Sequence, residues 1–349
     1  MRMQLRACAL ALASLTAFAS HGNDTADPPL GIADRPPAIA DPPPELTTSG
    51  SIPESGSIPA PGPGSIPEEE VLVAAPEPRY VAPTLRDRIG RVWAPVYING
   101  QGPFRLVLDT GATGSAVIQS VATRLGAPVE ALPLKLIGAT GQAMVPAVHV
   151  ESIEVGDLWL GNRKVAIVPD VFGGAEGVLG ADGLSDKRIV IDFRKDQISI
   201  RHSRASMSGA GFTRIPVKIR HGHLLMFDVK LAGVRTRAML DTGAQATIGN
   251  TRLREALARK KRRGQPGVII GVTLDEQQGE TLVSPPVTIA GITIRGMRVT
   301  FGDIHIFDAF GMTDQPAILI GMDMIGLLET LIIDYKRREL HLLPRAGID

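Results

Sequence analysis

The sequence predicts a mostly-β protein made of two similar lobes in tandem, with a few short helices, preceded by a disordered tail. Three observations predict this fold class. Apolar runs in the 349-residue chain are short and separated by turn formers, among them 38 Gly and 27 Pro. A set of motifs occurs twice in the same order, which indicates an internal repeat. The stretch before the first set is dominated by Pro, Gly, Ser and Ala and lacks the apolar residues that a core requires.

Residues 1–19 have the three parts of a secretory signal peptide. Arg2 and Arg6 supply a positive start, an apolar run follows, and Ala17-Phe18-Ala19 forms a cleavage site. An uncleaved anchor is the alternative, but this run is too short to cross about 30 Å of hydrocarbon, and no later run is long enough. We therefore expect cleavage, no membrane span in the mature chain, and export to the periplasm or beyond it. Cys8, the only cysteine, would leave with the signal peptide, so a thiol nucleophile is excluded.

Residues 20–84 are predicted to be a disordered or polyproline-like linker. Ser-Ile-Pro units recur at Ser51, Ser57 and Ser65, and proline disfavours both helices and central strands. The alternative is an inhibitory pro-segment that covers a site until it is removed. Such a segment would need an apolar or basic docking face, and this acidic, Pro-rich stretch offers little of either.

The first lobe is expected over residues 85–208 and begins with a hairpin. Two apolar strands, residues 92–98 and 104–108, flank an Asn-Gly turn at Asn99, which is a strong hairpin signal. The second strand delivers Asp109 to an Asp-Thr-Gly turn. The elements expected after it are a helix over 116–125, a hairpin over 133–146 with its loop at 138–141, strands over 148–155 and 163–168, the motif Val178-Leu179-Gly180, and a strand pair over 189–200.

The second lobe is expected over residues 209–349 and repeats this order. An apolar strand again ends in Asp-Thr-Gly, at Asp241, and a helix over 253–263 follows. Two copies of one acid-bearing turn suggest a single site built from two halves. The remaining landmarks are a glycine loop at Gly271, the motif Leu319-Ile320-Gly321, and a strand pair over 331–342.

The two Asp-Thr-Gly turns, the glycine loops and the two apolar-apolar-Gly motifs together resemble those of the aspartic proteases. The resemblance covers residues 92–342 and is greatest to the retropepsin-like branch, with two lobes fused in one chain as in the pepsins. It implies two acid-protease β-barrel lobes in a pseudo-twofold monomer, with a cleft between them for a peptide or protein substrate. It also implies endopeptidase activity that needs neither a cofactor nor a metal.

Asp109 and Asp241 are the predicted catalytic pair. Hydrolysis of a peptide bond without a metal or a covalent intermediate needs one group to take a proton from water and another to donate a proton to the carbonyl oxygen. Two carboxyl groups about 3 Å apart can do both, because they cannot both ionise and so share one proton, as is established for aspartic proteases. The sequence leaves open which aspartate carries that proton.

The residues after each aspartate are assigned supporting roles. Gly111 and Gly243 suit a turn in which backbone amides approach the carboxylates, since glycine has no Cβ. The resemblance implies that Thr110 and Thr242 hydrogen-bond across the lobe interface. It also implies that the first glycine loop is a flap that closes over the substrate, with an ordinary surface hairpin as the alternative. The predicted flap residues are Ile137, Gly138, Ala139, Thr140 and Gly141.

Other interpretations of single motifs explain less of the sequence. Each aspartate could cap the following helix, but capping does not explain why the whole set recurs. His221-Gly222-His223 and the cluster of Asp303, His305 and Asp308 could each bind a metal, although the former lacks a third ligand. The basic run 259–263 fits the end of a helix better than an anionic docking patch or a processing site.

The net charge and the motifs exclude some classes of function and leave two alternatives to the endopeptidase. A net charge of +1 gives no reason to expect a nucleic-acid partner, because such binding needs a basic excess or a clustered basic face. One alternative to the endopeptidase is a non-catalytic peptide-binding module that keeps the fold, although it would not need a proton-sharing pair. Another is a chain in which each half pairs with a half of a second chain.

Overall fold

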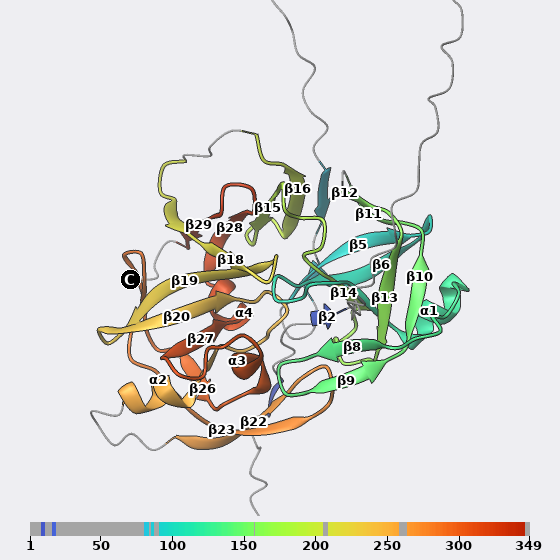
Figure 1. Cartoon of the computed structure of the whole chain (residues 1–349). Helices are drawn as coiled ribbons and strands as arrows, with labels where there is room; N and C mark the ends of the chain where they lie inside the picture. Colours follow the sequence, from blue (N-terminus) through green and yellow to red (C-terminus); the bar gives the residue numbers. More distant parts are fainter. Residues whose placement is uncertain are drawn as a thin grey trace, which may run out of the picture. The chain divides into compact units, whose positions relative to one another are not determined.

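Figure 1 shows the computed structural model of the chain. The structure describes residues 8–10, 16–18, 80–83, 85–86, 91–156, 158–204, 209–257 and 264–345. The chain divides into two compact units, one of residues 1–19 and 78–349 and one of residues 20–77, and the latter lies outside the described residues. The predicted cleavage position after Ala19, most of the predicted linker and the basic run 259–263 lie outside them too.

The mostly-β fold class is confirmed, since among the described residues 50% lie in strands and 9% in helices. Among the described residues, no helix is both long and apolar enough to cross a membrane. The helices in this part of the chain are α1 (Gln119–Leu125), α2 (Thr251–Ala256), α3 (His305–Ala309) and α4 (Met322–Ile325).

A nine-stranded sheet forms most of the first lobe, in the order β10-β13-β7-β14-β6-β5-β11-β12, with β4 paired to β5. The predicted Asn99-Gly100 turn joins β5 to β6, and both residues have the positive φ, 50° and 70°, of a two-residue hairpin turn. Its strands are β4 (Leu85–Arg86), β5 (Val92–Ile98), β6 (Gln101–Leu108), β7 (Ala116–Ile118), β10 (Ala147–Val150), β11 (Ile153–Val155), β12 (Leu158–Leu160), β13 (Arg163–Val168) and β14 (Gly177–Leu179); β8 (Leu134–Ile137) and β9 (Gln142–Val145) form a separate hairpin.

The second lobe repeats this strand order, which confirms the tandem architecture. Its sheet runs β22-β23-β26-β21-β27-β20-β19-β24-β25, and the last seven strands correspond in order to β13-β7-β14-β6-β5-β11-β12 of the first lobe. β18 pairs with β19 outside this path. The strands are β18 (Lys218–Arg220), β19 (Leu224–Leu231), β20 (Val234–Leu240), β21 (Ile248–Gly249), β22 (Gln265–Ile270), β23 (Glu276–Val283), β24 (Val287–Ile289), β25 (Ile292–Ile294), β26 (Arg298–Phe301) and β27 (Ala317–Ile320).

In each lobe, the strand that ends at an aspartate pairs with a parallel strand from the apolar-apolar-Gly motif. β14 runs parallel to β6, and β27 runs parallel to β20. The Asp109 amide donates to Leu179 O at 3.0 Å, and the Asp241 amide donates to Ile320 O at 3.0 Å. The two motifs that the sequence repeats therefore hold each aspartate at the same place, just beyond the end of its strand.

The helix predicted over residues 116–125 is shorter than expected. Residues Ala116–Ile118 form β7 between β13 and β14, because Val117 and Ile118 are β-branched and favour a paired strand. The helix α1 begins only at Gln119 and ends at Leu125; Gly126 follows it, with a φ of 58° that is the left-handed conformation of a helix C-cap.

The second predicted helix, over residues 253–263, begins earlier than expected. It starts at Thr251 because Asn250 caps it, with its side chain accepting a hydrogen bond from Leu253 N at 2.9 Å. It ends at Ala256, and residues 258–263 lie outside the described part of the chain. The helices α3 and α4 were not predicted, because four or five residues are too few to show a helical periodicity.

A six-stranded sheet joins the two lobes in the order β17-β29-β28-β15-β16-β3. At its centre, β15 of the first lobe pairs antiparallel with β28 of the second. The Arg188 guanidinium donates from Nε to Asp334 Oδ2 at 2.8 Å across this junction, and both side chains are buried. The strands are β3 (Tyr80–Pro83), β15 (Lys187–Asp192), β16 (Gln197–His202), β17 (Thr213–Pro216), β28 (Leu328–Asp334) and β29 (Glu339–Pro344).

Strand β3 lies within the stretch predicted as linker, residues 20–84. Its backbone pairs antiparallel with β16, from Tyr80 opposite Ile200 to Pro83 opposite Gln197. The boundary of the paired part of the chain therefore lies at or before Tyr80, not at residue 85. Composition missed this boundary because the partner strand lies more than a hundred residues later, and pairing at that distance leaves no local signal.

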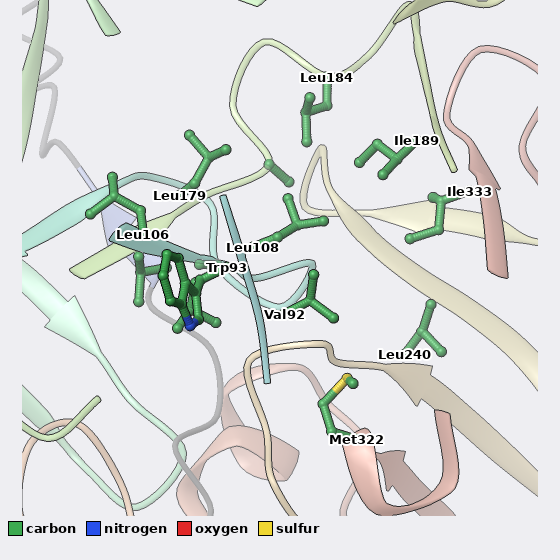
Figure 2. Packing of buried hydrophobic residues seen from close by; sticks show 14 of the residues in the cluster. Val92, Trp93, Leu106, Leu108, Leu179, Leu184, Ile189, Leu240, Met322 and Ile333 are labelled. Carbon is green, nitrogen blue, oxygen red and sulfur yellow. The ribbon is translucent and has the colours of Figure 1, made fainter. Parts of the chain in front are cut away.

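The cores of the two lobes are continuous at the base of the aspartates. Figure 2 shows Leu108, Leu240 and Ile333 within one cluster of buried apolar side chains. Leu108 directly precedes Asp109 and Leu240 directly precedes Asp241. The strand ends that carry the two acids are therefore anchored in packed apolar surroundings.

Two short strands near the amino terminus pair with the hairpins of the two lobes. β2 (Thr16–Phe18) pairs antiparallel with β8, and β1 (Cys8–Leu10) pairs parallel with β22. Both strands belong to the segment predicted as a signal peptide. The backbone of this segment thus adds a strand to one hairpin of each lobe.

Candidate active site

The two Asp-Thr-Gly turns meet where the lobes join, and both carboxyl groups are buried. Asp109 is 3% exposed and Asp241 is 0% exposed. The Gly111 amide donates to Asp109 Oδ1 at 2.8 Å, and the Gly243 amide donates to Asp241 Oδ1 at 2.9 Å. Each carboxyl group is therefore oriented by the amide of the glycine in its own turn.

The carboxyl groups of Asp109 and Asp241 are hydrogen-bonded to each other. A Cβ added at Gly243 would collide with the Asp109 carboxyl group, so the second turn approaches as closely as only glycine permits. Burial raises the pKa of Asp109 well above its ordinary value, and the charge of Asp241 and the hydrogen bond with it act in the same direction. The Gly111 amide and Arg91 lower this pKa but do not outweigh the other causes. The arrangement favours a pair that holds one proton.

Thr110 and Thr242 join the two turns through reciprocal hydrogen bonds. Thr110 Oγ1 donates to Leu240 O at 3.0 Å, and Thr242 Oγ1 donates to Leu108 O at 2.7 Å. Each hydroxyl also accepts a hydrogen bond from the amide of the other threonine, at 3.1 and 3.2 Å. The contacts between lobes that the resemblance implied are present, and they hold the two aspartates in register.

The apolar-apolar-Gly motifs pass directly behind the two turns. A Cβ added at Gly180 would collide with the backbone of Gly114, and one at Gly321 would collide with the backbone of Ala246. Glycine is needed at both positions because two backbones are in contact there.

The loop predicted as a flap connects β8 to β9. Ile137 ends β8, and the Gly138 amide closes the loop by donating to Gly141 O at 2.8 Å. The predicted flap residues therefore lie together at the end of a hairpin, the shape that a lid requires.

The tip of this loop is buried against the second lobe. The Ile306 amide donates to Ala139 O at 3.1 Å, and the Gly271 amide donates to Thr140 Oγ1 at 3.0 Å. Since Gly271 belongs to the corresponding glycine loop of the second lobe, the two loops contact each other. A hinged lid would have to break these contacts in order to open.

Two buried polar residues near the aspartates were not predicted from the sequence. Arg91 is 1% exposed, its Nη1 donates to Gly243 O at 3.5 Å, and its guanidinium carbon lies 5.8 Å from the centre of the Phe172 ring. Tyr335 is also buried, and burial together with the charge of Asp109 raises the pKa of its hydroxyl group. Arg91 lowers the pKa of Asp109, whereas Tyr335 lies within reach of the charge of Asp109.

Alignment of the two halves of the repeat could have identified both residues from the sequence. Arg91 corresponds to Leu224 in the second half, and Tyr335 corresponds to Phe193 in the first. In both pairs, the repeat places a polar residue where its other copy has an apolar one. Such departures at positions expected to be buried mark candidates for a special role.

The residues considered as metal ligands are used differently. In the part of the chain that the structure describes, no group of three or more His, Cys, Asp or Glu side chains could hold a metal ion. Asp303 instead accepts a hydrogen bond from the Thr251 amide at 2.9 Å, at the start of α2. His223 points inward and contacts backbone carbonyl groups.

Comparison with known proteins agrees with this architecture. The model of a family described as aspartyl protease matches residues 94–182 and 227–324, which together make up more than half of the chain. Each matched region contains one Asp-Thr-Gly turn and one apolar-apolar-Gly motif. A search of curated proteins found no match. With two matched regions on two lobes of the same strand order, the chain belongs to the aspartyl protease family, as a tandem retropepsin-like member.

Proposed function

We propose that this chain is an exported aspartic endopeptidase in which Asp109 and Asp241 together activate a water molecule. The observation that carries the proposal is the hydrogen bond between two buried carboxyl groups, one from each lobe. Membership of the aspartyl protease family supports a protease-type function. The signal-like composition of residues 1–19 supports export.

A shared proton allows the pair to act as base and acid in one step. The ionised carboxylate takes a proton from water as the water oxygen attacks the carbonyl carbon of the substrate. The protonated partner gives its proton to the carbonyl oxygen. When the tetrahedral intermediate collapses, the C–N bond breaks, the amine leaves with a proton from the pair, and the pair regains one proton from the intermediate.

An extended peptide is the substrate that fits this site. The edges of β8 and β22 each accept a strand from the amino-terminal segment, so their backbone groups can pair with an added chain. Main-chain hydrogen bonds of this kind provide affinity without reading the sequence, and side-chain pockets then select the residues beside the cut.

The same pairing is what favours a second candidate function, a peptide-binding module without turnover. Strand addition to β8 and β22 requires no proton transfer, so it would serve binding alone. The two functions differ in whether the substrate is cut and in whether the aspartates are needed.

The decisive experiment measures cleavage of a mixed peptide library across a range of pH by the protein and by Asp109→Asn and Asp241→Asn. Each substitution keeps the shape of the side chain and removes the carboxyl group, so kcat should fall by about 10²–10⁴-fold or more. Asp170→Asn, at an exposed position, is the matched control and should retain full activity. Cleavage that survives in both aspartate variants would overturn the mechanism, and binding without cleavage by the unaltered protein would favour the module.

Mixing the two inactive variants tests whether halves of different chains pair. If each site forms within one chain, a mixture of Asp109→Asn and Asp241→Asn should remain inactive. Activity that appears on mixing would mean that an intact aspartate from each variant meets in a site shared between chains.

Export is tested by expressing the full chain in a bacterium with a periplasm and measuring the mass of the protein in each cell fraction. We expect a periplasmic product that begins at Ser20. A product of full length that stays in the cytoplasm would contradict this part of the proposal.

A further inference from the structure

His223 connects the second lobe to the first Asp-Thr-Gly turn and has no role in the mechanism above. It lies between β18 and β19 and is 2% exposed. Its Nε2 is 3.2 Å from Gly111 O, and its Nδ1 is 2.8 Å from His221 O. Both partners are backbone carbonyl groups, which can only accept hydrogen bonds.

A neutral imidazole can satisfy only one of these two contacts. It carries a single N–H, so its other nitrogen directs a lone pair at a carbonyl oxygen. The contact of Nδ1 with His221 O is the shorter one, so the single hydrogen of the neutral ring is better placed on Nδ1. Nε2 and Gly111 O are then two acceptors that face each other. The imidazolium carries two N–H groups and satisfies both carbonyls.

The other Asp-Thr-Gly turn is held in a similar way by an arginine side chain. Arg91 directly precedes β5, as His223 directly precedes β19, and its Nη1 donates to Gly243 O at 3.5 Å. An arginine keeps its charge at every pH at which proteins are ordinarily folded. Of the two glycine carbonyls, that of Gly111 is therefore the one whose contact depends on pH.

We propose that His223 is a positioning residue which, when protonated, ties the first Asp-Thr-Gly turn to the second lobe and so completes the active site at acidic pH. The inference rests on the proposed function, because it concerns the regulation of the same site. Gly111 is held on two sides in this state: its amide donates to Asp109 Oδ1, and its carbonyl accepts from His223. Protonation thus restricts the turn that orients one of the two acids.

The surroundings of His223 decide where it changes charge. Burial lowers the pKa of His223 below its ordinary value of about 6.5, and the charge of His221 acts in the same direction, against the two carbonyl contacts. On the far side of Gly111 lies Asp109, whose pKa is itself raised by Asp241 and lowered by Arg91, and whose charge raises the pKa of Tyr335.

Because the pKa of His223 is lowered, its protonation affects stability and the contacts of Gly111 only in the acidic range. Because the unfolded chain binds this proton more readily than the folded one, protonation of His223 reduces the free energy of unfolding as the pH falls below about 6.5. The same protonation completes the hydrogen bonds at Gly111. The site is therefore expected to assemble in an acidic range in which this residue contributes less to global stability.

The first test follows the two turns by NMR as the pH is lowered. Labelling with carbonyl-¹³C threonine and ¹⁵N glycine selects the amides of Thr-Gly pairs, which include those of Gly111 and Gly243. We expect the Gly111 signal to move with the titration of the His223 ring nitrogens. In His223→Gln this movement should disappear, while any movement caused by the aspartate pair should remain in both glycine signals. A Gly111 signal that does not respond to the titration of His223 would overturn the inference.

The second test is the alkaline limb of the plot of kcat/KM against pH. In His223→Gln the loss of a charge-assisted hydrogen bond should lower kcat in acid by about threefold to tenfold. The alkaline limb should then reflect the aspartate pair alone. His221→Gln is the matched control, because His221 is exposed in the same turn. His221→Gln should keep the alkaline limb but move it to higher pH, because the substitution removes the charge of His221, which lowers the pKa of His223. An unchanged profile in His223→Gln would contradict the proposal.

The two readouts separate this inference from the proposed function. If the protein cleaves no peptide, the proposed function fails, and the NMR titration still decides whether His223 controls the Gly111 turn. If His223→Gln does not fold, the NMR titrations of the unaltered protein and of His221→Gln are enough to test the inference. The Gly111 titration should then occur at higher pH in His221→Gln, and equal midpoints would refute the coupling.

Discussion

Corresponding residues of the repeat have different partners in the two lobes. Asp182 and Asp323 each lie two residues after the glycine of an apolar-apolar-Gly motif. Asp182 forms an ion pair with Arg163, whereas Asp323 accepts hydrogen bonds from the hydroxyl and the amide of Thr247, at 2.6 and 3.0 Å. Burial raises the pKa of both carboxyl groups, and their partners oppose it. The repeat thus determines where an acid lies but not what stabilises it.

The hydroxyl groups between the two turns have a measurable structural value. Thr110→Val keeps the side-chain shape but leaves Leu240 O and the Thr242 amide without the Thr110 hydroxyl. Because both groups are buried, the free energy of unfolding should fall by about 1–3 kcal/mol, and kcat should fall as the aspartates lose their register. Urea unfolding and peptide cleavage measure the two effects.

Thr110→Ser provides the control for this prediction, because it keeps the hydroxyl group and removes only a methyl group. It should retain most of the stability and activity that Thr110→Val loses. Equal losses in the two variants would mean that packing of the methyl group, and not the hydrogen bonds, joins the turns.

Among the elements, the two glycine loops differ in how they are supported. The loop at 138–141 ends the separate hairpin β8–β9, whereas β22 and β23 continue the main sheet of the second lobe. The tip at Thr140 docks on Gly271 of the other loop. The hairpin with fewer sheet neighbours is therefore the one expected to move when a substrate enters, and the second loop is its fixed contact.

The six-stranded sheet between the lobes contains a buried ion pair. Arg188 and Asp334 pair across β15 and β28, and Ser203 Oγ also donates to Asp334 Oδ2 at 2.6 Å. Burial raises the pKa of Asp334, but Ser203, the Arg337 amide and Arg188 outweigh it, so the net pKa is lowered. Its contribution to stability is therefore present above the pKa of the unfolded carboxyl group, about 3.9, and is lost as the pH falls through the lower folded value.

Arg188→Met should destabilise the protein by about 3–5 kcal/mol near neutral pH, because it leaves a buried carboxylate without its cation. Arg194→Met removes a cation that pairs with Glu329 at an exposed position, and it should cost less than about 1 kcal/mol. Thermal or urea unfolding measures both. The difference between the variants should shrink as the pH is lowered and Asp334 becomes protonated, and a difference independent of pH would exclude the ion pair as its cause.

For the molecule as a whole, the amino-terminal segment, residues 1–19, affects whether a substrate can reach the site. The backbones of β1 and β2 pair with β22 and β8, the two strands that we propose receive the substrate. A chain that still carries residues 1–19 should therefore bind peptide more weakly than one that begins at Ser20. This effect should appear as a higher KM with little change in kcat, since the segment competes with the substrate.

Cleavage kinetics of the full and shortened chains test this competition. Ala17→Pro in the full chain is the matched variant, because proline removes a backbone donor from β2 without changing the length of the segment. It should restore part of the affinity. Equal KM values for all three proteins would show that the segment does not compete with the substrate.

Local patterns determined much of the fold and of the candidate site. Asn99-Gly100 predicted the first hairpin because few residues adopt a positive φ at both turn positions. The repeated Asp-Thr-Gly and apolar-apolar-Gly motifs predicted two equivalent lobes with an aspartate at the end of one strand in each. These features were predictable because a positive φ or a close approach of two backbones restricts which residues fit at a position. Such restrictions appear directly as motifs in the sequence.

Only the tertiary structure decided what surrounds the pair. It places Arg91 and Tyr335 near Asp109, points both nitrogens of His223 at carbonyl oxygens, and docks the tip at Thr140 on the other lobe. Each of these contacts joins segments far apart in the chain, and burial and charge act through space. The residues alone identified the two acids, but the folded interface supplies the burial, the charges and the hydrogen bonds that set the pKa of Asp109.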